Sequence, residues 1–142
     1  MPRTELHDLR NDDRDAAYEA VRASRSAWPR AAFADRARFD DWTRRDDVSA
    51  WVVGSDDDIV GVAAAMDVDG DREILLAVSP SADDDATTDA LRLLTAREPE
   101  RPLYACVAAD DQPSHDVLAR IGFVEHRRDG DDVVYVLPPT LE

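Results

Sequence analysis

The chain has 142 residues, the length of one domain, and 44% of them are apolar, which is enough for a core of ordinary size. Its 32 acidic residues and 17 arginines give a formal charge of −15, and it contains no lysine. A surface this negative repels phosphates, so we expect neither nucleic acid nor an anionic membrane as a partner.

Periodicity, capping residues and turns predict strands and helices in a fixed order. Alternating or continuous apolar runs indicate strands, and apolar residues three and four apart indicate helices. The segments Ser55–Asp58 and Val68–Asp71 have turn composition, so the strands around them should form an antiparallel meander. In chain order we expect a strand at Glu5–Leu9, a helix capped by Asn11 or Asp12 and ended by Pro29, a helix at Asp35–Arg45, strands at Ala50–Val53, Ile59–Met66 and Arg72–Val78, a helix from Pro80 to Glu98, a strand at Leu103–Val107, a helix from Pro113 to Ile121, and strands at Phe123–Arg128 and Val133–Leu137.

This order predicts a single domain over residues 1–142. Its class is α+β (mixed α/β), with a mixed sheet of six or seven strands and helices on both faces. The fourth and fifth strands should run parallel, because a helix lies between them in the sequence.

Two segments carry a resemblance to a known family. Ile74–Leu94 is an apolar strand followed by Ser79-Pro80 and a helix, and Asp111–Phe123 is a helix that ends in Gly122-Phe123. Both resemble the corresponding segments of the GCN5-related N-acetyltransferase (GNAT) family, and the order of elements is that of a GNAT domain. The resemblance implies a GNAT-like three-layer fold whose fourth and fifth strands diverge. It also implies acetyl-CoA or another acyl-CoA as cofactor if the chain is active.

The family's pyrophosphate-binding segment is altered in this chain. In the family an Arg-Gly-x-Gly-x-Gly/Ala run places backbone N–H groups around the pyrophosphate at a helix N-terminus. Here Asp83 stands at the arginine, Asp84 and Ala86 at the first two glycines, Asp85 between them, and Thr88 at the third. A carboxylate about 5 Å from a phosphate opposes it by roughly 1 to 3 kcal/mol, depending on screening. We therefore expect acyl-CoA binding to be weakened or lost, although the same aspartates also suit a helix N-terminus.

The resemblance implies further site residues. A glutamate on the fourth strand often serves as general base in GNAT enzymes, and Glu73 holds a comparable place. The pantetheine arm pairs with backbone groups of the same strand, which Ala77, Val78 and Ser79 would offer whatever their side chains are. Asp111, at the family's asparagine, would hydrogen-bond the arm or cap its own helix.

Other family positions are changed. Leu118 replaces the tyrosine that protonates the departing sulfur, so the general acid is missing. We interpret His115 as an exposed surface histidine and Cys106 as a small core residue. If the chain is active, Arg92 or Arg97 would supply a replacement contact for the pyrophosphate.

Three functions remain open from the sequence. The first is a GNAT-like domain in which acyl-CoA binding and catalysis are weakened or lost. The second is an active N-acetyltransferase that acts through Glu73 on a small-molecule amine, a peptide or a protein N-terminus. The third is a non-catalytic binding or dimerisation module, in which edge strands or Trp28, Trp42 and Trp51 would form a homodimer interface.

Cysteine usage and hydropathy bear on location. The single cysteine allows no internal disulfide, and the longest uncharged stretch, Ile74 to Ala82, is far too short to span a membrane. The N-terminus lacks the apolar core of a signal peptide. We expect a cytoplasmic protein, and no metal site, because the three histidines lack metal-ligand spacing.

Overall fold

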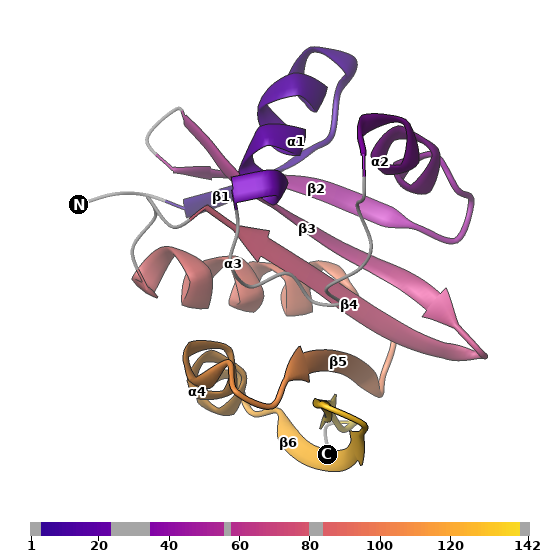
Figure 1. Ribbon diagram of the computed structural model, residues 1–142, viewed down its shortest axis with the longest axis vertical. Coiled ribbons are helices and arrows are strands. Elements are labelled where there is room, and N and C mark those ends of the chain that lie inside the picture. Colours follow the sequence, from indigo (N-terminus) through magenta and orange to yellow (C-terminus); the bar gives the residue numbers. More distant parts are fainter. Residues whose placement is uncertain (1–3, 24–34, 56–57, 80–83, 140–142) are drawn as a thin grey trace.

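Seven strands form one mixed sheet with helices on both faces (Figure 1). The computed structural model describes residues 4–23, 35–55, 58–79 and 84–139. The observed order confirms the predicted fold class. The elements are β1 (Thr4–Asp8), the 3₁₀ turn η1 (Asn11–Asp13), α1 (Arg14–Ala23), α2 (Arg36–Thr43), β2 (Ser49–Ser55), β3 (Asp58–Val68), β4 (Asp71–Val78), α3 (Asp84–Arg97), β5 (Leu103–Ala108), α4 (Gln112–Ile121), β6 (Val124–Asp129) and β7 (Asp132–Leu137).

The strands lie in the order β1-β2-β3-β4-β5-β7-β6. Strands β2, β3 and β4 form the predicted antiparallel meander, and β1 pairs antiparallel with β2 at its edge. Strands β5, β7 and β6 form a second antiparallel group. The pair β4–β5 joins the two groups and is parallel, as predicted from the helix between them. The sheet therefore consists of two antiparallel parts joined at one parallel seam.

Each face of the sheet has its own apolar core, because successive side chains of a strand point to opposite faces. On one face α3 and α4 pack against residues such as Ile74, Leu76 and Ala105. On the other face α1 and α2 pack against Leu75 and Ala77 of the same strand β4. The helices contribute their apolar ridges to these cores: Ala90, Leu91 and Leu94 from α3, Val117 and Leu118 from α4, Ala17 and Val21 from α1, and Phe39 and Trp42 from α2.

Helix ends agree with the sequence in two places and differ in one. Asp35 caps α2 by accepting from the Arg38 N–H at 2.9 Å, and Gly122 ends α4 with a left-handed φ of 113°. The predicted cap of the first helix is wrong. Asn11 and Asp12 lie within η1, whose tight turn brings the next residue, Asp13, back to accept from the Arg10 N–H at 3.1 Å. The predicted stop at Pro29 lies outside the described residues.

Gly61 permits a close approach of β3 to the end of β4. It lies opposite Val78, and a Cβ at this position would stand 2.3 Å from the Ala77 carbonyl oxygen. We expect Gly61→Ala to lower the free energy of unfolding by about 1 to 3 kcal/mol, because the backbone of β4 would have to move. Calorimetry should show a lower Tm, whereas Gly54→Ala, whose Cβ would meet His7 side-chain atoms at 3.4 Å, should change it little. Equal Tm values for the two variants would contradict this account.

Candidate active site between diverging strands

Strands β4 and β5 touch at one end and then separate. Within the described residues their register contains two pairs, Arg72 with Leu103 and Glu73 with Tyr104. Beyond these pairs β4 continues along β3 to Val78, and β5 continues along β7 to Ala108. Figure 1 shows β5 turning away from β4. The predicted divergence of the fourth and fifth strands is therefore confirmed.

The end of β4 directs backbone groups into this divergence. Ser79 donates its N–H to the Val60 carbonyl at 2.6 Å, so its backbone faces β3. Because the direction of backbone groups alternates along an antiparallel strand, the N–H and C=O of Val78 and Leu76 point away from β3, toward β5. Ala77 turns back, and its carbonyl lies against Gly61. Of the three residues expected to bind a pantetheine arm, Val78 has the orientation that such pairing requires.

Glu73 lies at the point where the two strands part. Its carboxyl is partly buried, and burial raises its pKa above the ordinary value. The negative charge of Asp71 adds to this rise, whereas the guanidinium of Arg127 on β6 lowers the pKa. Glu73 is thus a carboxylate whose proton affinity is increased by its surroundings, as a proton acceptor in catalysis requires.

Helix α3 begins at Asp84, within the acidic run that the sequence comparison aligns with the family's pyrophosphate segment. Asp85 is exposed in its first turn, while Ala86 and Thr88 are buried, and Asp83 lies outside the described residues. Arg97 does not replace the missing loop arginine. It lies about 20 Å further along the helix, at about 1.5 Å per residue, and donates to the Leu6 carbonyl at 3.1 Å.

Arg92 is nearer to the start of α3 but already has an acidic partner. Its Nη1 lies 3.2 Å from Asp89 Oδ1, and both side chains are exposed. No arginine or lysine lies in residues 84–91, which form the first two turns of α3. This helix end therefore lacks the positive side chain that usually assists pyrophosphate binding.

The start of α4 shows what Asp111 does in this chain. Asp111 accepts from the Ser114 hydroxyl at 2.6 Å and from the Ser114 N–H at 3.4 Å, so it caps the helix. Leu118, at the family's tyrosine, is fully buried in the core that α3 and α4 share. The described part of α4 therefore presents no phenol at that position.

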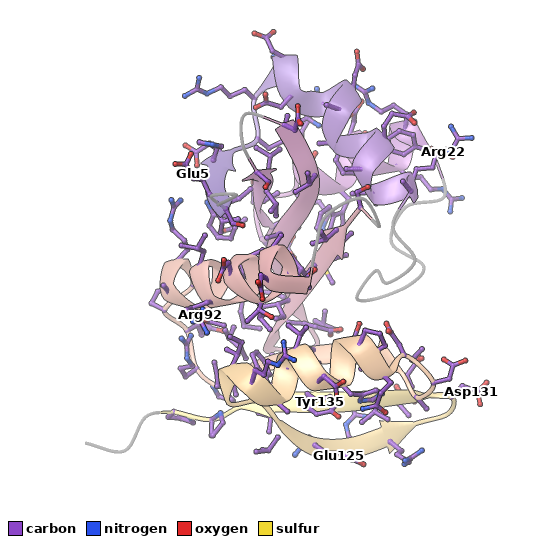
Figure 2. The ribbon with its side chains drawn as sticks, turned by 90° about the vertical axis from the view of Figure 1, so that its left-hand side faces the viewer. Glu5, Arg22, Arg92, Glu125, Asp131 and Tyr135 are labelled. Atoms are coloured by element: carbon purple, nitrogen blue, oxygen red, sulfur yellow. The ribbon has the colours of Figure 1, made fainter. Side chains whose placement is uncertain are left out.

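His115 corrects the sequence interpretation. It is half-buried, not an exposed surface residue, and its ring is held from both sides. Nδ1 lies 2.6 Å from the Tyr135 hydroxyl, and Nε2 lies 3.0 Å from the Ala108 carbonyl. In the neutral ring Nε2 donates to the carbonyl and Nδ1 accepts from Tyr135. Figure 2 shows Tyr135 beneath α4, where these bonds join the helix to β7.

The sheet face opposite α4 contains residues that sequence reasoning missed. On β5 the residues facing α4 are buried, whereas Tyr104 and Cys106 on the opposite face are half-exposed. The interpretation of Cys106 as a core residue is therefore wrong, because its side chain points to the face that α4 does not cover. The Tyr104 ring lies 5.8 Å from that of His126 on β6, where the register with β7 shifts. The register pairs Arg127 with Val134 and Val134 with Cys106, so Arg127 shares this face. Burial raises the pKa of the Cys106 thiol to about 11, which makes it a poor nucleophile.

Two kinds of feature do not occur in the parts of the chain that the structure describes. No helix there is both long and apolar enough to cross a bilayer. No three His, Cys, Asp or Glu side chains in those ranges are grouped closely enough to hold a metal ion.

Comparison with known proteins identifies the fold. No protein-family model matches the chain, and no curated protein matches it. Solved structures do match. An Escherichia coli ribosomal-protein alanine N-acetyltransferase superposes with a TM-score of 0.76 at 15% identity, covering 99% of this chain and 96% of that one. A Thermus thermophilus acetyltransferase gives 0.74 at 18% identity, covering 96% and 97%.

A third match was solved with a ligand. The Campylobacter jejuni N-acetyltransferase PseH, in complex with acetyl coenzyme A, has a TM-score of 0.69 at 14% identity, covering 97% of this chain and all of that one. The chain therefore has the fold found in GNAT acetyltransferases. At these identities the likeness shows the fold and does not by itself assign the reaction.

Proposed function

We propose that this chain is an acyl-CoA-dependent N-acyltransferase that holds its donor through the pantetheine arm and only weakly through the nucleotide. The observation that carries the proposal is the divergence of β4 from β5 beyond Glu73. It leaves the backbone of Leu76 and Val78 directed at a space in which an extended amide-bearing chain adds as a strand. Pantetheine is such a chain, because it contains two amide groups.

The acidic loop accounts for the weak hold on the nucleotide. Asp83, Asp84 and Asp85 follow the end of β4, where the donor's pyrophosphate lies when the pantetheine arm pairs with that strand. A helix N-terminus attracts one anion, and here the protein's own carboxylates already supply negative charge. Donor affinity then depends on the arm, and the nucleotide contributes little.

The chemistry needs few protein groups. An amine attacks the thioester carbonyl, its proton passes to Glu73 directly or through one water, and the thiolate leaves as the C–S bond breaks. The absence of a tyrosine at Leu118 does not prevent this step. An alkyl thiol has a pKa of about 8.5, so the thiolate is a tolerable leaving group that water can protonate.

The loop is tested by restoring the family's residues. We expect Asp83→Arg with Asp84→Gly and Ala86→Gly to raise acetyl-CoA affinity tenfold or more in isothermal titration, because donors and positive charge return together. Acetyl-pantetheine, which lacks the nucleotide, should bind both proteins equally. Asp12→Arg with Asp46→Gly makes the same change in net charge at exposed positions away from β4 and should not change acetyl-CoA affinity.

Two results would overturn parts of this proposal. Low-micromolar binding of acetyl-CoA by the unaltered protein in moderate salt would show that the aspartates do not oppose the pyrophosphate. Mass spectrometry can detect acyl transfer to an amine. If the protein binds acetyl-pantetheine but transfers its acyl group to no amine, the result would instead favour a non-catalytic binding module. The observation that supports this alternative is the buried Leu118 at the position of the family's tyrosine.

A further inference from the structure

A surface with charged and aromatic side chains crosses β4, β5, β7 and β6 on the face opposite α4. It begins at Glu73, continues through the rings of Tyr104 and His126, and ends at Arg127; we call it the acceptor face. The register places Tyr104 beside Glu73, and the ring contact of 5.8 Å connects Tyr104 to His126. A carboxylate and a guanidinium thus stand at the two ends of an aromatic floor.

The two charged ends lie close enough to act on each other. The positive charge of Arg127 lowers the pKa of Glu73, although two strands, β5 and β7, separate their backbones. The bulge at His126 makes this possible, because it shifts the register of β6 and turns Arg127 to the face of Cys106 and Val134. Without the bulge, Arg127 would point to the α4 face.

Among the described residues, Arg127 has only a weak acidic partner. Its ion pair with Asp129 is long, at 3.9 Å between Nη1 and Oδ2, and both side chains are more than half exposed. Such a pair contributes little, so a ligand can displace it. The neighbouring arginine differs: Arg128 pairs in register with Val133 and so faces α4.

We propose that the acceptor of this site is a small amino-carboxylate, whose amine is placed at Glu73 and whose carboxylate is bound by Arg127. This assignment of the acceptor rests on the acyltransferase function proposed above and specifies the class of its amine substrate. An arginine suits a carboxylate because its N–H groups match both oxygens. In a protein with a net charge of −15 an anionic group needs such a local cation to bind at all. The rings of Tyr104 and His126 would lie beneath the acceptor's carbon chain.

The test compares matched acceptors in acetyl transfer from saturating acetyl-CoA. Glycine, β-alanine and 4-aminobutyrate are each paired with their amides, which keep the amine and the length but lack the negative charge. For at least one length we expect the acid to have a kcat/KM at least tenfold above that of its amide. Arg127→Gln should abolish this ratio, and Arg128→Gln on the other face of the same strand should preserve it.

The ratio separates carboxylate binding from other effects of the substitution. Loss of Arg127 also changes the proton affinity of Glu73, but that change affects acids and amides alike. Acetylation of the amides with no preference for the acids would overturn this inference and leave the acyltransferase function standing. An equal loss of preference in the Arg128 variant would also overturn it. Failure to acetylate any of the six amines would overturn both.

Discussion

Arg72→Ala should lower the free energy of unfolding by about 3 to 5 kcal/mol, the usual loss when one member of a buried ion pair is removed. Arg72 Nε lies 2.6 Å from Glu98 Oε1, and the two side chains are only 11% and 8% exposed. The same guanidinium donates to the Asp47 carbonyl at 2.6 Å and to Asp67 Oδ1 at 3.1 Å. Its removal leaves the Glu98 carboxylate buried without its main partner.

The expected change is visible in thermal unfolding. A chain of this size loses about 2 to 4 °C of Tm per kcal/mol, so the midpoint should fall by roughly 10 °C. Arg92→Ala is the matched control, because Arg92 forms an exposed pair with Asp89 three residues earlier on its helix and should cost less than about 1 kcal/mol. If both variants melt alike, the buried Arg72–Glu98 pair does not stabilise the fold more than an exposed pair does.

Glu73→Gln should reduce kcat for acetyl transfer about a hundredfold or more, the usual contribution of a general base, with a smaller effect on donor affinity. Glutamine has the size of glutamate but cannot accept the amine proton. Circular dichroism and Tm should stay close to those of the unaltered protein. A variant that turns over normally would show that Glu73 is only a partly buried acid at the end of a strand seam.

The pH dependence of the unaltered protein supplies a second readout for Glu73. Burial and the charge of Asp71 raise its pKa, so the unprotonated base is lost at a higher pH than for an ordinary glutamate. The rate should therefore fall as pH decreases through this raised pKa. Arg127 opposes the rise, so Arg127→Gln should move the acid limb to still higher pH. A limb at the ordinary glutamate value in both proteins would contradict the assignment.

Much of this fold can be predicted from local signals. Strand alternation, the start of the second helix near Asp35 and the left-handed position at Gly122 each depend on a few neighbouring residues, and the structure agrees with all three. The prediction for the cap of the first helix is also wrong for a local reason, because three acidic or amide residues in succession can each cap a helix. Only the backbone selects the 3₁₀ turn that makes Asp13 the capping residue.

The site is less predictable because it depends on register between distant strands. Whether Ala77 or Val78 faces the divergence follows from how β4 is aligned on β3, which no local pattern encodes. The face of Arg127 depends on one extra residue in β6, and the partner of His115 is Tyr135, twenty positions away on β7. Half-exposed aromatic residues within an otherwise apolar strand, such as Tyr104, are the one signal that could have indicated this surface.

The narrow contact between β4 and β5 gives a bound donor a thermodynamic role beyond the reaction. Two register pairs connect strands that elsewhere pair along their length with other neighbours. A donor whose arm pairs with β4 occupies the place of an extra strand and joins the two parts of the sheet. Because such a ligand binds the folded chain alone, stability rises with the logarithm of its concentration above Kd. On the function proposed above, weakened donor affinity would therefore lower ligand-linked stability along with catalytic efficiency.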